Sequence, residues 1–205
     1  LWGKTAGRKD CCRSWYRDGV YRCTNRIIGE NMNNGRFSRW LPLLMAVLII
    51  IADQITKAIV VKTIEYHTIG HTFLNGFFRI IHTRNPAIAF SIGRGLPDQV
   101  RSVVFVIIPL VLLVAALVYF IKSKELTGLQ RWAVAGIIGG GFGNIIDRLF
   151  RPMGVVDFLD FKFYGLFGLE RWPTFNIADS AVVVSGILIV LSIFFQKENK
   201  QPDTV

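Results

Sequence analysis

The stretch VVFVIIPLVLLVAALVYFI, residues 103–121, contains neither a charged side chain nor an amide. About 20 apolar residues in a helix are enough to cross the ~30 Å hydrocarbon core of a bilayer. The whole chain of 205 residues is 52% hydrophobic and only 19% charged, which is not the composition of an ordinary soluble domain. Its 16 Phe and 5 Trp also exclude a disordered chain. We therefore expect a membrane protein.

Three further apolar segments lie at about 41–61, 130–146 and 175–195. Segment 41–61 is interrupted by polar residues, among them Asp53 and Lys57. Segment 130–146 carries five glycines, which allow another backbone to approach closely but make a poor lone helix. The predicted fold is an all-α membrane protein with four transmembrane helices.

The loops between these segments set the remaining architecture. Residues 73–81 and 87–92 alternate apolar and polar side chains, which predicts a small β-sheet in the first long loop, 62–99. The second long loop, 148–174, is rich in Phe, Tyr and Trp, and this composition is typical of the membrane interface. We expect it to form an interfacial aromatic loop or helix.

Basic residues near the segment ends predict the orientation, because Lys and Arg are enriched on the cytoplasmic side of a membrane. Four spans place both termini on one side. The basic residues expected on that cytoplasmic side are Arg26, Arg36, Arg39, Lys122, Lys124, Arg131, Lys197 and Lys200. The two long loops, and with them the sheet, are then extracytoplasmic.

The domain organisation follows from composition. We expect a polar basic N-terminal extension at 1–38, a single four-helix membrane domain at 39–198 and a polar tail at 199–205. Residues 1–31 differ from the rest, and Met32 is the start we expect for the natural protein. All three cysteines (Cys11, Cys12 and Cys23) precede it, and no second pair stands at zinc-ligand spacing.

Several function classes can be set aside. The net charge of +10 is spread over loops and forms no basic face with interleaved aromatics, so no nucleic-acid partner is expected. The sequence has no HExxH, G-x-S-x-G or Walker motif. Its three histidines, His67, His71 and His82, stand in one loop without a carboxylate cluster, so we expect no metal and no cofactor.

Charged groups inside predicted spans are costly and need a reason. Asp53 and Lys57, four residues apart, share one helix face, where they form either a structural ion pair or a substrate contact. Asn144, Asp147 and Arg148 share a face at the end of the glycine-rich span. Arg148 is the expected local partner for Asp147, in a helix-end salt bridge.

Asp157, in GVVDF, and Asp179, three residues after Asn176, have apolar neighbours. Two carboxylates brought together at a partly desolvated site share one proton, which is the chemistry of aspartic proteases. On the residues alone, Asp179 is equally explained as a helix cap or anchor. A proton relay through Asp53, Asp157 and Asp179 in a small transporter, and a structural subunit, also remain open.

Five motifs decide among these alternatives because of their order on four spans. Together they resemble the bacterial lipoprotein signal peptidase family, signal peptidase II, over about residues 39–196. The motifs are ADQITK at 52–57, NPAIAF at 85–90, GGGFGNIIDR at 139–148, GVVDFLDF at 154–161 and FNIADS at 175–180. One departure is Ala87, which stands where the family usually has a glycine.

The resemblance implies a membrane aspartic endopeptidase without a cofactor. It would cut diacylglyceryl-modified prolipoproteins on the N-terminal side of the lipidated cysteine. It would be a monomer in the bacterial cytoplasmic (inner) membrane, in contact with lipids, with its active site near the extracytoplasmic face. The implied catalytic pair is Asp157 and Asp179, and the implied supporting residues are Asp53, Lys57, Asn85, Asn144, Arg148 and Asn176.

Overall fold

The computed structural model describes residues 27–85, 97, 100 and 103–198, with backbone alone at 27–38 and 196–198. The chain divides into two units, Leu1–Trp40 and Leu41–Val205. The cysteines, the 87–92 segment with Ala87, and the tail at 199–205 lie outside the described residues. In the first unit, the described part is the beginning of helix α1 (Ile27–Thr63). Apart from Arg39 and Trp40 of α1, everything that follows concerns the second unit.

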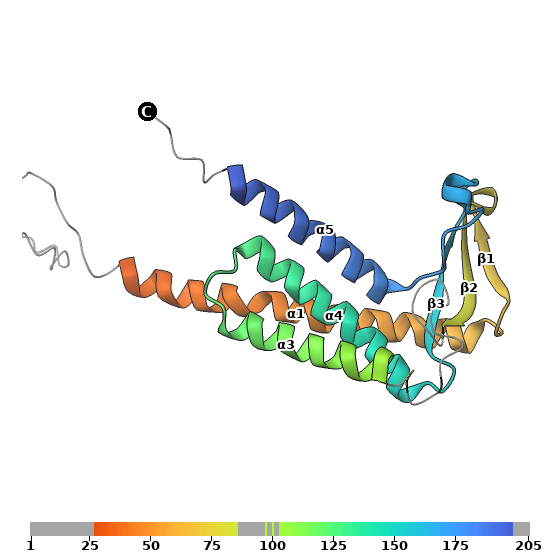
Figure 1. Ribbon diagram of the computed structural model, residues 1–205, viewed down its shortest axis with the longest axis horizontal. Helices are drawn as coiled ribbons and strands as arrows, with labels where there is room; N and C mark the ends of the chain where they lie inside the picture. Colours follow the sequence, from red (N-terminus) through yellow and green to blue (C-terminus); the bar gives the residue numbers. More distant parts are fainter. Residues whose placement is uncertain (1–26, 86–96, 98–99, 101–102, 199–205) are drawn as a thin grey trace, which may run out of the picture. The chain divides into compact units, whose positions relative to one another are not determined.

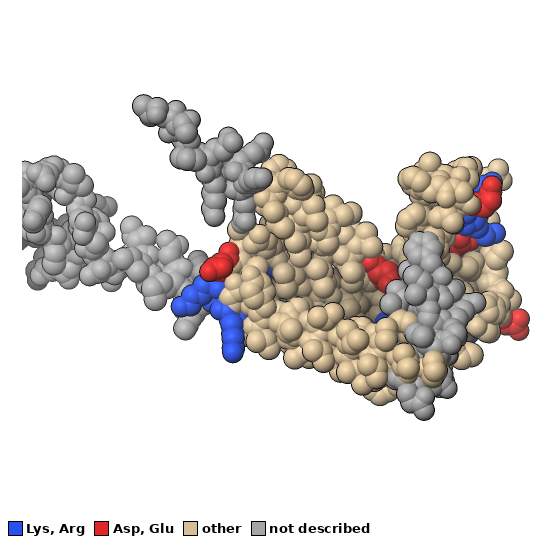
Figure 2. Space-filling view, viewed as in Figure 1, with Lys and Arg blue, Asp and Glu red and all other residues tan. Residues whose placement is uncertain are grey.

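Four helices in the described ranges are long and apolar enough to cross a membrane. Their spanning parts are Arg39–Thr63 in α1, Val103–Lys122 in the π-helical turn η3 (Val103–Ile107) and α3 (Ile108–Lys122), Gly128–Phe150 in α4, and Ile177–Phe195 in α5 (Ile177–Glu198). The expectation of four spanning helices is confirmed. In Figure 2 the charged side chains on the face shown gather toward the ends of the helices, as a bilayer requires.

Helix α4 is the most buried of the four, since half of its apolar window is covered by protein against about a fifth or less in the others. Its glycines explain this. A Cβ added at Gly139 would come within 2.8 Å of the Ala46 carbonyl oxygen of α1, and one at Gly140 would collide with the Ala178 carbonyl oxygen of α5. Glycine at these two positions therefore lets α4 approach the backbones of two neighbouring helices.

A three-stranded antiparallel sheet in the order β1-β2-β3 lies at one end of the helices (Figure 1). Strands β1 (Ile69–Phe73) and β2 (Phe78–Asn85) come from the first long loop and are joined by the 3-10 turn η1 (Leu74–Gly76). The small sheet was predicted, but residues 73–81, expected as one strand, contain the turn of a hairpin. Asn75 adopts a left-handed conformation there, with φ at 53°.

The third strand, β3 (Val155–Phe161), comes from the second long loop, where no strand was predicted. Its residues are buried on both faces, so they do not show the alternation by which a half-exposed strand is recognised. The rest of that loop contains the short 3-10 turn η4 (Leu166–Gly168). The aromatic loop is thus partly a strand of the sheet.

Two sets of contacts attach the sheet to the end of α1. Val60 and Ile64 pack against Val156 and Phe158 of β3 in one buried apolar cluster. Beside it, the buried His82 of β2 has its Nδ1 2.8 Å from the carbonyl oxygen of Ile64. Strand β3 is therefore held where α1 ends, and this positions the carboxylates that β3 carries.

Candidate active site

Asp157 lies in the middle of the buried stretch of β3. Its side chain is nearly inaccessible, with 4% of the residue exposed, and its backbone is opposite Thr83 of β2. Asn176 Nδ2 donates a hydrogen bond of 2.7 Å to Asp157 Oδ1. The strand therefore presents this carboxylate to the residues that begin α5.

Asp179 lies in the first turn of α5 and is half-buried. Its Oδ2 accepts a 3.2 Å hydrogen bond from the backbone N–H of Asn176, and its own N–H donates one of 2.9 Å to Asn176 Oδ1. This reciprocal pattern is a capping box, which stabilises the start of a helix. Asp179 therefore does cap α5, but only one of its oxygens is used for that.

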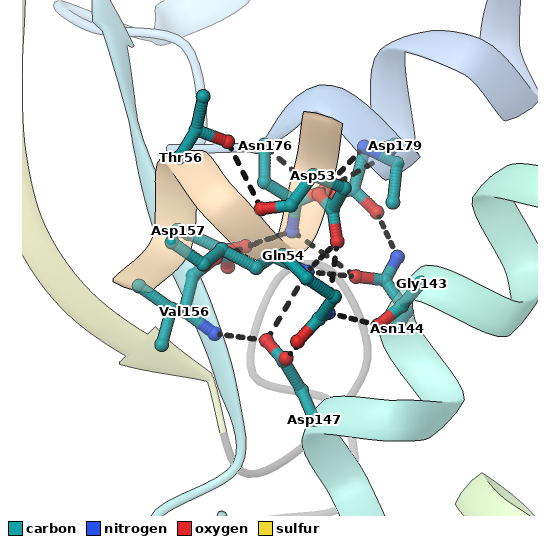
Figure 3. Close-up of polar contacts among 12 residues, drawn as sticks. Asp53, Gln54, Thr56, Gly143, Asn144, Asp147, Val156, Asp157, Asn176 and Asp179 are labelled. Carbon is teal, nitrogen blue, oxygen red and sulfur yellow. Dashed lines mark hydrogen bonds and ion pairs between the residues drawn. The ribbon is translucent and has the colours of Figure 1, made fainter. Parts of the chain in front are cut away.

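The other oxygen of Asp179 faces a pair of buried amides (Figure 3). Asn144 Nδ2, on α4, donates a 2.7 Å hydrogen bond to Asp179 Oδ1. Asn176 Nδ2 in turn lies 3.2 Å from Asn144 Oδ1 while it holds Asp157. Two carboxylates from a strand and a helix are thus connected through two amides, one from α4 and one from the start of α5.

The environment of Asp157 favours its protonated form. Burial raises the pKa of Asp157 to about 7, the nearby Asp179 carboxylate adds to this, and the hydrogen bond from Asn176 opposes it. Because one carboxylate is buried and the other half-exposed, the pair favours a state with one proton and one negative charge. Such a state contains an acid and a base side by side.

Lys57 contacts one of the two amides, Asn144, and neither Lys57 nor its neighbour Asp53 has any exposed surface. Lys57 Nζ is 2.7 Å from Asp53 Oδ2 and donates a 3.0 Å hydrogen bond to Asn144 Oδ1. Gly143 makes room for this arrangement, since a Cβ there would lie 2.8 Å from Asp53 Oδ2. The structure shows the ion pair that was one of the two readings offered by the sequence.

Asp147 and Arg148 do not form the salt bridge that was predicted. Asp147 instead pairs with Lys57 at 3.1 Å and with Arg151 at 3.2 Å. Arg148 interacts electrostatically more strongly with Asp179 and Asp157 than with Asp147. Its buried Nε has no hydrogen-bond partner in the described structure. The expectation placed Asp147 and Arg148 on one helix face, but successive residues of a helix point about 100° apart. The helix-end partner of Asp147 is Arg151, four residues further on.

Asn85 and Gln54 also lie close to the residues of the site. Asn85 ends β2 opposite Val155, so its backbone lies two residues from Asp157 along the neighbouring strand. Gln54 was not among the predicted site residues, yet its Nε2 contacts Asp53 Oδ2 at 3.2 Å, the Gly143 carbonyl oxygen at 3.0 Å and Asp147 Oδ1 at 3.0 Å. An amide in an apolar span, next to an aspartate, was the signal for it.

The charged groups of the site are held by hydrogen bonds and ion pairs. In the described ranges, no three His, Cys, Asp or Glu side chains come together in a way that could hold a metal ion. Each negative charge has an amide, a backbone N–H or a cationic side chain beside it. The arrangement supports general acid and base chemistry by two carboxylates.

Comparison with known proteins agrees with this chemistry. The family model described as signal peptidase (SPase) II matches residues 45–195. The lipoprotein signal peptidase of Treponema pallidum is 44% identical over 163 residues, which cover 80% of this chain and 87% of the treponemal protein. That of Borreliella afzelii is 47% identical over 149 residues, covering 73% of this chain and 86% of its own.

A solved structure has the same fold. It is a bacterial membrane enzyme determined by the in meso method at 2.3 Å resolution, with a TM-score of 0.68 and 32% sequence identity. The match covers 80% of this chain and 94% of that one. With four spanning helices, the multi-pass membrane chain described above belongs to the signal peptidase II family, the aspartic peptidases that remove signal peptides from lipoproteins.

Proposed function

We propose that Asp157 and Asp179 are the catalytic dyad of this peptidase. The observation that carries the proposal is the chain of short hydrogen bonds from Asp157 through Asn176 and Asn144 to Asp179. Both carboxylates are held by side-chain amides, which donate hydrogen bonds without adding charge. Neither carboxylate is neutralised by a direct salt bridge among the described residues, so the two remain free to exchange protons with a substrate.

The two aspartates have different roles at rest. Asp157 is the more buried and its pKa is raised to about 7, so it holds the shared proton. Asp179 is half-exposed and accepts two hydrogen bonds from N–H donors, which stabilise a carboxylate. Asp179 is therefore the general base and Asp157 the general acid.

The reaction follows from these roles. Asp179 removes a proton from a water molecule, whose oxygen bonds to the scissile carbonyl carbon, while Asp157 donates its proton to the carbonyl oxygen. The tetrahedral intermediate collapses when the carbon–nitrogen bond breaks. Asp179 then returns its proton to the leaving amine, and Asp157 recovers its proton from the hydroxyl group. Arg148 lies close enough to both carboxylates to favour the singly ionised pair.

The substrates are prolipoproteins that carry a diacylglyceryl group on the cysteine, and the bond cut is the one before that cysteine. The placement of the dyad supports this. Asp179 begins a spanning helix and Asp157 lies in the adjoining sheet, so the dyad is at an end of the helices (Figure 1). A scissile bond there can be reached while the lipid chains and the signal helix remain in the bilayer.

The experiment that tests the dyad uses purified protein reconstituted in lipid. It compares a diacylglyceryl-modified prolipoprotein with the same precursor lacking the lipid, for the wild type, Asp157→Asn and Asp179→Asn. We expect cleavage of the lipidated precursor only, insensitive to EDTA, and a loss of at least about 10³-fold in each variant. Asp160→Asn, on the same strand, is the control. Turnover that survives in either dyad variant would refute the assignment.

We further propose that both termini are cytoplasmic, that the sheet is extracytoplasmic and that the enzyme is a monomer in the bacterial inner membrane. The basic residues of the 122–131 connection support the orientation. A C-terminal green fluorescent protein fusion should fluoresce, and a C-terminal alkaline phosphatase fusion should be inactive. The opposite pattern would reverse the orientation.

A further inference from the structure

Two carboxylates outside the proposed dyad accept backbone hydrogen bonds next to it. In each case the donor is the N–H of the residue directly before a dyad aspartate. Asp53 Oδ1, on α1, accepts a 3.0 Å hydrogen bond from Ala178 N, next to Asp179. Asp147 Oδ2, on α4, accepts a 3.0 Å hydrogen bond from Val156 N, next to Asp157. Each catalytic element therefore has its own anchor, one residue away from the reacting group.

Lys57 connects the two anchors. Its Nζ is 2.7 Å from Asp53 Oδ2 and 3.1 Å from Asp147 Oδ2, and it also donates a 3.0 Å hydrogen bond to Asn144 Oδ1. These three partners use all three hydrogens of the ammonium group. The fixed tetrahedral geometry of that group constrains how far apart the two anchors can lie.

The triad is sealed from the solvent. The side chains of Asp53, Lys57 and Asp147 have 0% exposure. Gln54 closes one side by donating to both carboxylates, at 3.2 Å and 3.0 Å. An ion pair buried in this way is held firmly only while all its partners are present, because an unpaired charge in such a place is costly.

We infer that Asp53, Lys57 and Asp147 form a brace that sets the separation of the Asp157 and Asp179 carboxylates, and that all three are positioning residues for the reaction. The inference rests on the proposed dyad. Two carboxylates share one proton only at a suitable distance, and they belong here to a strand and a helix from different parts of the chain. A misplacement of about 1 Å at a reacting group can reduce turnover by about 10²-fold.

The test removes one anchoring hydrogen bond without leaving a buried charge unpaired on Asp53. In the double variant Lys57→Met/Asp53→Asn, the asparagine keeps an oxygen that can accept from Ala178 N. In Lys57→Met/Asp53→Leu, that acceptor is lost, although the net charge is the same and the leucine is similar in size. We expect kcat per folded enzyme to be at least tenfold lower in the leucine variant, with KM for the lipidated precursor changed less than twofold.

The pH profile separates positioning from a purely structural role. If the brace sets the separation of the carboxylates, relaxing it weakens their coupling, and the acidic and alkaline limbs of kcat move toward each other in the leucine variant. A structural role lowers only the folded fraction, measured by gel filtration and thermal unfolding in the same lipid, and leaves both limbs in place. Asp147→Asn and Asp147→Leu provide a second matched pair for the Val156 anchor, should the double variants fail to fold.

Equal kcat per folded enzyme and identical limbs in the asparagine and leucine variants would overturn the brace. That failure differs from failure of the dyad itself. If the brace is wrong and the dyad right, Asp157→Asn remains inactive. If the dyad is wrong, Asp157→Asn retains turnover whatever the brace variants do.

Discussion

Strand β3 carries two buried aspartates in nearly the same local sequence, Val-Asp157-Phe and Leu-Asp160-Phe. Their side chains have different partners. Asp160 is 3% exposed, like Asp157, but is clamped by two arginines: Arg79 Nε at 2.8 Å and Arg171 Nε at 2.7 Å. Asp157 has an amide as its hydrogen-bonding side-chain partner, and a second carboxylate nearby. Two similarly buried carboxylates on one strand therefore differ in their partners, which are two guanidinium groups for Asp160 and an amide for Asp157.

The arginine clamp joins parts of the sheet that are distant in sequence. Arg171 also donates to the Gly76 carbonyl oxygen at 3.2 Å and to the Asp160 carbonyl oxygen at 3.3 Å. It thereby ties the β1–β2 turn to β3 and to the segment before α5. Asp160 is neutralised by this clamp and holds the sheet together, whereas the raised pKa of Asp157 favours its protonated form.

The largest expected effect is on kcat, which should fall when Asp157 is replaced but not when Asp160 is replaced. We expect Asp157→Asn to lose at least about 10³-fold in kcat, because it removes the acid of the dyad. Asp160→Asn should keep kcat per folded enzyme within about threefold but lower the unfolding temperature, because two arginines lose their carboxylate. Cleavage rates and thermal unfolding in the same lipid measure both. Equal loss of kcat in the two variants would end the distinction.

The next effect concerns pH. Because the pKa of Asp157 is raised to about 7, we expect kcat to fall as the pH rises through about 7, when the acid loses its proton. The hydrogen bond from Asn176 opposes the raised pKa, so Asn176→Leu should move this alkaline limb to higher pH. In Asp160→Asn the limb should stay where it is. A limb that moves downward in Asn176→Leu would contradict the assignment of the proton to Asp157.

The same group has a smaller effect on stability. A carboxyl whose pKa is raised in the folded state binds more protons there than in the unfolded chain between its ordinary value of 3.8 and about 7. Its contribution to the free energy of unfolding is therefore greatest at acidic pH and falls as the pH rises through this window. Asp157→Asn should flatten that part of the stability profile measured by denaturation. An unchanged slope would mean that Asp157 is not protonated in the folded enzyme.

The smallest effect distinguishes the two arginines of the clamp. In the part of the chain that the structure describes, Arg171 contacts the carboxylate and two carbonyl oxygens, while Arg79 is hydrogen-bonded to the carboxylate. Lysine cannot reproduce such a fork, so Arg171→Lys should destabilise by about 1–2 kcal/mol and Arg79→Lys by less than about 1 kcal/mol. Thermal unfolding measures the difference. The reverse order would show that the contacts to the turn contribute nothing.

Much of the site was predictable, but by resemblance more than by physics. Taken alone, Asp179 was as well explained by capping as by catalysis, and the structure shows why: one oxygen caps α5 and the other meets Asn144. The apolar neighbours of Asp157 and Asp179 singled out both residues, and the motifs then identified them as the implied catalytic pair. Gln54 and the pairing of Asp147 with Lys57 were not predicted, because these contacts join different helices and no local period encodes them. The pair of Asp147 with Arg151, four residues further on, follows the helix period, and the prediction missed it.

The sequence by itself determined the four spanning helices, because an apolar run about 20 residues long has no other stable place than a bilayer. It also determined the family, because five motifs stand in order along the spans. Only the tertiary structure decided that β3 completes the sheet, that one lysine serves two carboxylates, and that Asp160 is neutralised while Asp157 is not. These outcomes depend on which side chains meet across helices and strands, and such contacts have no local pattern in the sequence. For β3, burial of both faces also removes the alternation of apolar and polar residues by which a strand is recognised.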